Sequence, residues 1–167
     1  MKRTHTLTLL LLFKFCFTAL ISHAQWTILD TKLPDVNFTD VYVDGDNIIA
    51  TGYNNVSYNG DACIAISNDG GLTWNTDLQC IRHDSQVYPQ TISFIDKNIG
   101  YIGGRTGNGN AFTWKTSDGG LTWNWDMFSV TDIISLYDMT FVTKKTSYSC
   151  GSGRNNGTAG VIVKTED

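Results

Sequence analysis

A nine-residue segment that occurs twice constrains the fold of this chain more than any other feature. Residues 67–75 have the sequence SNDGGLTWN, and residues 116–124 repeat it as TSDGGLTWN after an offset of 49 residues. A further 49 residues lead to Asp167, the last residue, in a segment KTED that matches KTSD at residues 115–118. Self-similarity at a fixed period of this size is typical of repeat folds, in which every copy supplies one structural unit. The chain therefore contains two full copies and the start of a third.

The rest of each period predicts short β-strands. Runs of alternating or β-branched residues recur at 41–44, 93–96 and 140–143, and again at 49–52, 101–104 and 149–151. Gly, Asn or Asp bounds each run, which is typical of strands joined by tight turns. The chain has 16 Gly and only 2 Pro, and no stretch after residue 24 has a helical period. We predict an all-β protein.

The nine-residue segment has the chemistry of a tight turn between two strands. Its Gly-Gly pair permits positive φ, and its Asp can accept hydrogen bonds from the amides of the turn. The flanking hydroxyls can tie the two arms together, and the Trp can cover the turn with a large apolar face. A single copy could be a chance hairpin, but two near-identical copies at one spacing indicate a repeated structural element.

The pattern S/T-x-D-x-G-x-T-W resembles the Asp-box, or bacterial neuraminidase repeat. Asp-box repeats occur in β-propellers such as sialidases, sortilin-type receptors, some xyloglucan hydrolases and photosystem II stability/assembly factor-like proteins. The DGGLTW version, with the strand YIGG at 101–104 about 15 residues before Thr116, is most similar to the last group. The resemblance implies a structural role for Ser67, Asp69, Gly71, Thr73, Trp74, Thr116, Asp118, Gly120, Thr122, Trp123 and Asp167.

The resemblance also implies an architecture, an Asp-box β-propeller fragment of about three four-stranded blades. In this family each blade has four antiparallel strands, and the Asp-box is the turn between the third and the fourth. The blades then cover residues 37–79, 88–128 and an incomplete 135–167 within a domain at 25–167. Residues 26–30 resemble an outer strand that completes the last blade of a ring.

Three blades are fewer than a closed propeller needs, which is at least about four. Three explanations remain open from the sequence. The protein continues beyond Asp167, several short chains assemble into one ring, or the blades form an open stack with exposed edges. We favour the continuation, and an open stack is unfavourable because unpaired strand edges invite aggregation.

Residues 1–24 have the pattern of a secretory signal peptide. Lys2 and Arg3 precede an apolar stretch, and Ser22, His23 and Ala24 form a small-x-small cleavage site before Gln25. A membrane anchor is the alternative, but Lys14 interrupts a stretch that is already short of the roughly 20 apolar residues a spanning helix needs. We expect a secreted or cell-surface protein without a stable membrane anchor after cleavage.

Charge and cysteines narrow the possible ligands. All 16 acidic residues follow residue 24, so the secreted part is strongly acidic and a nucleic-acid partner is not expected. Cys63 and Cys80 flank one predicted hairpin and could form a disulfide, which leaves Cys150 free and, we expect, buried. His83 is the only histidine after the signal, and there is no CxxC pair, so we predict neither a metal site nor a cofactor.

The residues give little support for catalysis. Sialidases use an arginine triad, a Tyr/Glu pair and an Asp, but Glu166 is the only glutamate in the chain and lies at a turn position. A glycosidase with two carboxylates could draw on fifteen Asp, yet Asp77 and Asp126 are 49 residues apart and so belong to the repeat. We predict no catalytic residue and favour a non-enzymatic protein, although an enzyme remains open.

Two arginines form the candidate ligand site. Arg105 and Arg154 are 49 residues apart, and each follows the glycine-rich end of a predicted second strand. Both would then lie at the end of the blades opposite the Asp-boxes, where two guanidinium groups could bind an anion or a peptide carboxylate. Surface arginines paired with nearby Asp residues are the alternative.

The expected function is a secreted, non-enzymatic scaffold that binds a protein, a peptide or a glycan. A propeller-type glycoside hydrolase, similar to a sialidase or a xyloglucanase, is the first alternative. A cell-surface adhesion protein is the second.

Overall fold

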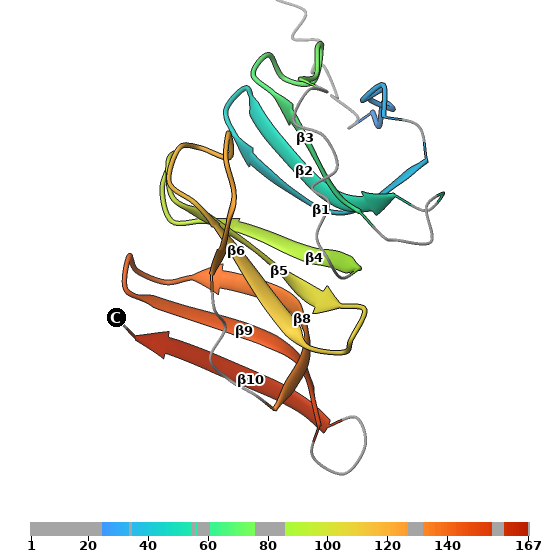
Figure 1. Ribbon diagram of the computed structural model, residues 1–167. Coiled ribbons are helices and arrows are strands. Elements are labelled where there is room, and N and C mark those ends of the chain that lie inside the picture. The colour runs from blue at the N-terminus through green and yellow to red at the C-terminus, as the bar shows by residue number, and fades with distance from the viewer. Residues whose placement is uncertain are drawn as a thin grey trace, which may run out of the picture.

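The computed structural model describes residues 25–33, 35–54, 56, 61–75, 86–126, 132–154 and 159–166. Within these ranges the chain forms ten β-strands and no helix, grouped into three antiparallel sheets (Figure 1). This confirms the predicted all-β fold, and the three sheets agree with part of a β-propeller. We call the sheets blades one, two and three in chain order. No helix among the described residues is long and apolar enough to cross a membrane.

The strands follow one another within each blade. Blade one contains β1 (Val36–Asp44), β2 (Asn47–Asn54) and β3 (Ala62–Ser67). Blade two contains β4 (Val87–Phe94), β5 (Gly100–Thr106), β6 (Ala111–Thr116) and β7 (Asn124–Asp126). Blade three contains β8 (Ile133–Phe141), β9 (Thr146–Gly153) and β10 (Ala159–Glu166).

Four strands per blade are visible only in blade two, where β7 pairs with the outer edge of β6. In blade one a single bridge between Ile66 and Asn75 occupies the corresponding place. Residues 76–85 and Asp167 lie outside the described residues, so the predicted blade boundaries at 79 and 167 stay predictions. β10 is the last described strand of blade three.

The first strand of every blade contains a β-bulge, and a glycine on the second strand makes room for it. The register shifts lie at 38/40 in β1, 89/91 in β4 and 136/138 in β8. A Cβ atom on the facing glycine would come within 2.0–2.2 Å of a first-strand carbonyl oxygen. The glycines are Gly52, Gly104 and Gly151, facing the oxygens of Asn37, Tyr88 and Ser135. These three glycines occupy equivalent positions, so they define which residues of one blade correspond to which residues of another.

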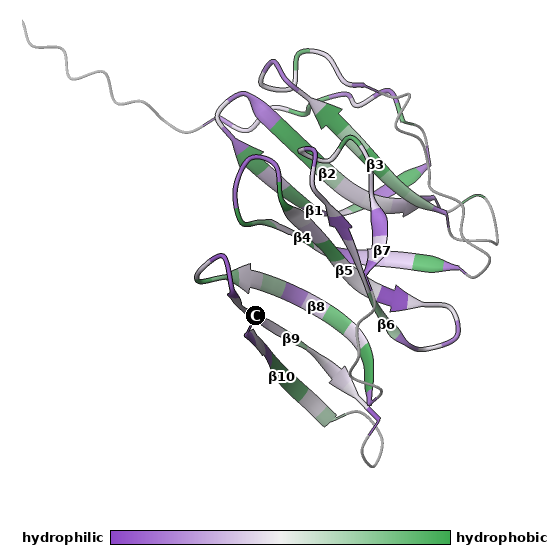
Figure 2. Cartoon of the chain, turned by 60° about the vertical axis from the view of Figure 1, so that its left-hand side comes forward, coloured by the Kyte–Doolittle hydropathy of each residue, from purple (hydrophilic) through white to green (hydrophobic). Residues whose placement is uncertain are grey.

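The blades stack face to face, so that the first strands of successive blades lie side by side (Figures 1 and 2). The seam between blades one and two is apolar. Ile49, Ile64 and Ile66 from blade one pack in one cluster with Ile92, Ile102 and Trp114 from blade two. Tyr42 also stacks on Phe94, with ring centroids 4.5 Å apart. This seam contains most of the buried hydrophobic side chains in the described residues.

The seam between blades two and three is smaller and more polar. Its buried apolar side chains are Ile133, Leu136 and Met139, against which Tyr101 of blade two packs. On β9 the residues that face inward are Ser147 and Ser149, which are buried without adding apolar volume. Blade three is therefore held by less hydrophobic area than blade two.

Hydrogen bonds join the first strands across both seams. Thr39 Oγ1 donates to the Pro89 carbonyl at 2.9 Å, and the Ile92 amide donates to Asp40 Oδ2 at 2.8 Å. At the second seam Ser135 Oγ donates to Gln90 Oε1. Because these bonds involve backbone groups or bulge residues of the first strands, they limit how far one blade can slide along the strand direction of the next.

The two outermost faces of the stack expose apolar side chains on β1 and β10 in the described structure. Val41 and Val43 on blade one are 53% and 57% exposed, and Ile162 on blade three is 81% exposed.

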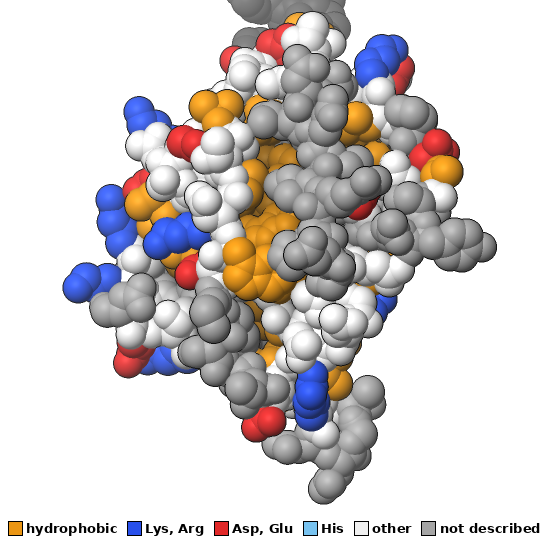
Figure 3. All heavy atoms as spheres, viewed as in Figure 1, with side chains coloured by type: hydrophobic (Ala, Val, Ile, Leu, Met, Phe, Trp, Pro, Cys, Tyr) orange, Lys and Arg blue, Asp and Glu red, His pale blue; other side chains and the backbone are white. Residues whose placement is uncertain are grey.

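Cys150 is free and exposed, so its predicted burial was wrong. The reason is its position: it pairs with Ile162 on the face of blade three that no described blade covers. Figure 3 shows further hydrophobic side chains near the middle of one side of the molecule, with Lys and Arg around them.

Residues 26–30 form no strand, in contrast to the prediction of an outer strand. Trp26 is 96% exposed and Ile28 is 99% exposed. A strand exists only where a neighbouring strand supplies hydrogen-bond partners, and no described strand lies along this segment.

Candidate ligand-binding site

Each repeated segment forms a closed polar network, which we call a repeat turn. In the second repeat turn, Asp118 Oδ1 accepts from the Thr122 amide at 2.9 Å and from Thr116 Oγ1 at 2.7 Å, and Asp118 Oδ2 accepts from Thr122 Oγ1 at 2.6 Å. The Gly120 amide donates to Thr116 Oγ1 at 2.9 Å. Asp118 Oδ1 thus accepts two hydrogen bonds and Oδ2 accepts one.

The first repeat turn has the same arrangement. Asp69 accepts from the Thr73 amide at 2.8 Å, from Thr73 Oγ1 at 2.6 Å and from Ser67 Oγ at 2.8 Å. The glycines have the positive φ angles that the turn requires, 69° at Gly70 and 89° at Gly71. The two copies therefore share one structure as well as one sequence.

Hydrogen bonding lowers the pKa of both turn carboxyls. For Asp118 the main cause is the hydroxyl of Thr122, followed by the Thr122 amide, and for Asp69 it is the hydroxyl of Thr73. Donors aimed at a carboxylate favour its charged form. Both groups are therefore ionised acceptors at neutral pH, which suits a structural role and does not suit a proton donor.

The Trp of each repeat turn is half-buried and differs in its hydrogen bonding. Trp123 Nε1 donates to the Gly120 carbonyl at 3.0 Å, so the indole closes over its own turn. Trp74 Nε1 is buried and finds no acceptor among the described residues. Trp114 and Trp125 flank Phe112 in an aromatic cluster.

Arg105 lies on an aromatic side chain at the opposite end of blade two. Its guanidinium carbon is 4.4 Å from the centre of the Tyr88 ring, and Tyr88 is its direct partner across β4 and β5. The Tyr88 hydroxyl donates to Gln86 Oε1 at 2.9 Å, and the Tyr53 ring from blade one meets Tyr88 edge-on at 5.4 Å. The aromatic ring contacts the face of the exposed guanidinium and holds it in place. The N–H groups of the guanidinium stay available to donate hydrogen bonds to a ligand.

Arg154 connects blade three to the same end of blade two. Its Nη2 donates to the Gly109 carbonyl at 2.9 Å and to Asn110 Oδ1, and its amide donates to the Asp132 carbonyl at 2.8 Å. Gly109 and Asn110 belong to the turn between β5 and β6, and Arg105 is the penultimate residue of β5, beside that turn. We call Arg105, Arg154 and Tyr88 the arginine end of the molecule.

The arginine end lies opposite the repeat turns. The β5–β6 turn precedes strand β6 and the second repeat turn follows it, so the two turns lie at opposite ends of that strand. Neither arginine takes part in a salt bridge with a described carboxylate, so the predicted alternative of Asp-paired arginines is not seen in this part of the chain. The sequence alone does not indicate Tyr88 or Asn110. Strand register places Tyr88 beside Arg105, and the packing of blade three on blade two places Asn110 beside Arg154.

A small concavity lies between blades one and two, beside the second repeat turn. It has a volume of about 180 Å³ and is lined by Tyr42, Phe94, Asp44 and Lys97, among others. Burial raises the pKa of the Tyr42 hydroxyl, and the negative charges of Asp44 and Asp96 add to this effect. The phenol therefore stays neutral, and the pocket offers a mixed aromatic and polar surface.

Among the described residues, no cluster of three or more His, Cys, Asp or Glu side chains is placed to hold a metal ion. Cys63 is fully buried and disulfide-bonded, whereas its predicted partner Cys80 lies outside the described residues. The pairing with Cys80 stays a prediction.

Comparison with solved structures finds, among its matches, YCF48 bound to D1 peptide. The TM-score is 0.55 at 20% sequence identity, over 81% of this chain and 39% of that chain. The two chains share a fold. This chain thus spans about two fifths of the length of YCF48. No protein-family model and no curated protein matches the sequence.

Proposed function

We propose that this protein is a secreted, non-enzymatic binding scaffold of the propeller type, whose arginine end takes up an anionic group of a protein or peptide. A peptide C-terminal carboxylate is the ligand that we favour. The observation that supports the proposal is the exposed guanidinium of Arg105, held over the Tyr88 ring without a described carboxylate partner. A guanidinium fixed in this way can bind a carboxylate through two parallel hydrogen bonds.

The fold comparison supports a peptide as the ligand class. YCF48, which shares the fold, is bound to D1 peptide in its solved structure. The hydrogen bonds of the two repeat turns further support assignment to the Asp-box class, since the Asp, Thr and Gly positions of the repeated motif all take part. A glycan partner, a hydrolase activity and an adhesive role on the cell surface remain the alternatives that experiments must separate.

Binding of two matched peptides tests the proposal. One peptide ends in a free carboxylate and the other in an amide, and fluorescence anisotropy of a labelled N-terminus measures both affinities. Because the preferred peptide sequence is unknown, the measurement uses a library of short peptides, each made in the carboxylate form and in the amide form. We expect the carboxylate forms to bind more tightly, and Arg105→Ala to weaken them by about ten- to a hundredfold, the range expected for charged hydrogen bonds.

Lys144→Ala is the matched control. Lys144 is an exposed cation on the turn between β8 and β9, at the opposite end of the molecule, where it pairs with Asp96 on the turn between β4 and β5. Its affinity should equal that of the wild type. Equal binding of carboxylate and amide peptides, or equal losses in the Arg105 and Lys144 variants, would refute the proposed carboxylate site. Turnover of a fluorogenic sialic acid substrate or of xyloglucan that disappears in an Asp variant would favour the hydrolase instead.

Secretion is tested separately. N-terminal sequencing of the protein recovered outside the cytoplasm should begin at Gln25, the residue after the proposed cleavage site. An intact N-terminus at Met1 in a membrane fraction would contradict secretion and support an uncleaved anchor.

A further inference from the structure

The concavity between blades one and two combines apolar walls with two opposite charges. The stacked rings of Tyr42 and Phe94 form one wall, and Ile49 supplies an aliphatic surface. Asp44 and Lys97 line the same cavity, which we call the seam pocket. Its volume of about 180 Å³ is below the roughly 300–1,000 Å³ of pockets for drug-sized ligands, so it suits a smaller molecule.

The second repeat turn closes one side of the seam pocket. Gly119 lines the pocket, and its amide donates to the Asn98 carbonyl at 2.9 Å. A Cβ atom on Gly120 would lie 3.0 Å from Ile49 Cδ1, so this turn of blade two rests directly on blade one. The pocket is therefore built from two blades that already pack together.

The first repeat turn contributes Asn68 to another side of the pocket. The Gly70 amide donates to the Asp46 carbonyl at 2.9 Å, which ties this turn to the turn between β1 and β2. Both turns of blade one that border the pocket are thus joined by a backbone hydrogen bond.

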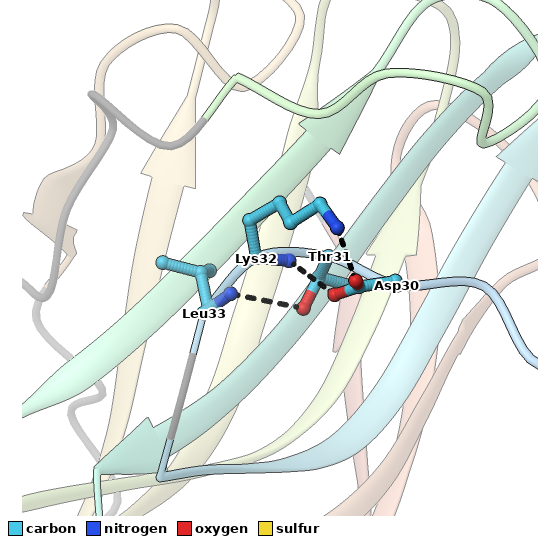
Figure 4. A network of polar contacts seen from close by, with 4 residues as sticks. All are labelled: Asp30, Thr31, Lys32 and Leu33. Carbon is cyan, nitrogen blue, oxygen red and sulfur yellow. Dashed lines mark hydrogen bonds and ion pairs between the residues drawn. The ribbon is translucent and has the colours of Figure 1, made fainter.

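The segment before blade one supports the first repeat turn from outside. A Cβ atom on Gly71 would lie 2.6 Å from Leu29 Cδ1, so the leucine packs directly against the repeat turn. Just after Leu29, Asp30 accepts hydrogen bonds from the Lys32 amide at 2.9 Å and from Lys32 Nζ, which fixes a compact turn (Figure 4). The walls of the seam pocket are therefore preformed.

The charges in the seam pocket lack the pairing that is present at the next seam. Lys97 and Lys144 stand at the same position, three residues after the first strand of their blades. Lys144 pairs with Asp96 of the preceding blade at 3.3 Å. Neither Lys97 nor Asp44 forms a salt bridge with a described residue.

The length of one turn explains this difference. Residues 45–46 alone join β1 to β2, whereas residues 95–99 join β4 to β5. The turn of blade one therefore stops short of the place from which Asp96 reaches Lys144. A charge pair closes the second seam, and the corresponding place at the first seam stays open.

A smaller side chain also leaves space at the first seam. Ile49 and Tyr101 are equivalent, since each precedes by three residues the glycine that faces the bulge. At the second seam Tyr101 packs on Phe141, with ring centroids 5.2 Å apart. Ile49 has less volume than tyrosine, and the seam pocket lies beside it.

We propose that the seam pocket binds a free α-amino acid with an apolar side chain. Asp44 pairs with the ammonium group of the ligand, and Lys97 pairs with its carboxylate. The ligand side chain lies against the aromatic wall and Ile49, where burial of apolar surface adds affinity. A free amino acid carries both charges on one carbon, so it serves both groups at once. The site lies at the opposite end of the blades from the arginine end.

Isothermal titration calorimetry of the full chain with L-leucine tests the proposal. Leucinamide lacks the carboxylate, isocaproate lacks the ammonium group, and glycine lacks the side chain. We expect leucine to saturate the site at millimolar concentration or below, and each analogue to bind at least about tenfold more weakly, because it loses a charged hydrogen bond or the apolar contact. Absence of saturable leucine binding, or equal affinity for leucine and leucinamide, would overturn the proposal.

Two variants assign the two charged groups. Lys97→Gln should weaken leucine about tenfold and leave leucinamide unchanged, whereas Asp44→Asn should weaken leucine by a similar factor and leave isocaproate unchanged. Lys145→Gln is the matched control, because Lys145 is exposed on the turn between β8 and β9 and does not line the pocket. Arg105→Ala should also leave leucine binding intact, so failure here is distinguishable from failure of the carboxylate site at the arginine end. Leucine binding that is lost in Arg105→Ala and kept in Lys97→Gln would refute the seam pocket.

Methyl NMR of the isoleucine side chains locates the ligand independently of affinity. Ile49 and Ile66 line the seam pocket, so their methyl signals should shift during the leucine titration. Ile133 is buried at the second seam, and its signal should not move. Shifts at Ile133 without shifts at Ile49 and Ile66 would contradict the assignment of the site.

Discussion

The glycine on the second strand of each blade is the sharpest test of how the fold is built. In Gly104→Ala the new Cβ would lie 2.2 Å from the Tyr88 carbonyl oxygen and 2.9 Å from Phe112 Cε1. A carbon and an oxygen need at least about 3 Å, so β4 and β5 must separate by close to 1 Å where they pair. The same separation would weaken the contact between Arg105 and Tyr88, the next pair along.

The magnitude follows from two costs and one gain. Overpacking costs about 1–3 kcal/mol, and one lost ladder hydrogen bond costs about 1 kcal/mol. Replacing Gly by Ala returns about 0.4–1 kcal/mol through the unfolded state. We therefore expect a loss of about 2–3 kcal/mol in the free energy of unfolding, or about 8 °C in Tm for a domain of this size.

Thermal unfolding followed by circular dichroism measures this loss. Gly160→Ala is the control, because an added Cβ there meets nothing within 4 Å, and we expect its Tm to stay within about 2 °C of the wild type. A Gly104→Ala protein as stable as the Gly160→Ala protein would show that the first two strands of a blade are not held at the spacing described, and the alignment of the blades would fail with it.

Three further outcomes are expected. The pKa of Asp118 is lowered in the folded state, so its contribution to stability is present above the ordinary carboxyl pKa of 3.8 and is lost as the pH falls through the lower folded pKa. In urea titrations, Asp118→Asn should therefore narrow the difference in unfolding free energy between pH 6 and pH 3. An unchanged difference would refute the role of these hydrogen bonds. Phe112→Ala removes a fully buried ring and should cost about 3–5 kcal/mol of unfolding free energy, whereas a loss below about 1 kcal/mol would mean that the aromatic cluster is not packed. Cys150 should react with a thiol reagent in the native protein without denaturant, and Cys150→Ser should remove that reaction; protection of Cys150 would show that its face of blade three is covered in solution.

The sequence predicted best what is local. Every side-chain hydrogen bond of the repeat turns joins residues within four positions of one another, so spacing alone places Asp69 and Thr73 together. The strands also follow from local alternation and turn residues. Their number and order within a blade came with the resemblance, and the structure agrees with both for blade two.

What the sequence did not predict depends on contacts between distant residues. Tyr88 supports Arg105 only because the bulge in β4 sets the register of the strand pair. Cys150 was expected to be buried from its residue type, yet its exposure depends on whether another sheet covers blade three. Residues 26–30 have the pattern of a strand, but pattern alone does not supply the neighbour that a strand requires.

The difference between the two seams has a consequence for the order in which the molecule comes apart. Blade two is held to blade one by an isoleucine-rich cluster and by bonds to backbone groups, whereas serines fill much of the face that joins blade three to blade two. Regions with fewer buried apolar contacts open at lower free energy. Blade three is therefore the first part to detach under heat or mechanical load, and it would leave blades one and two as a cooperative unit with its apolar seam intact.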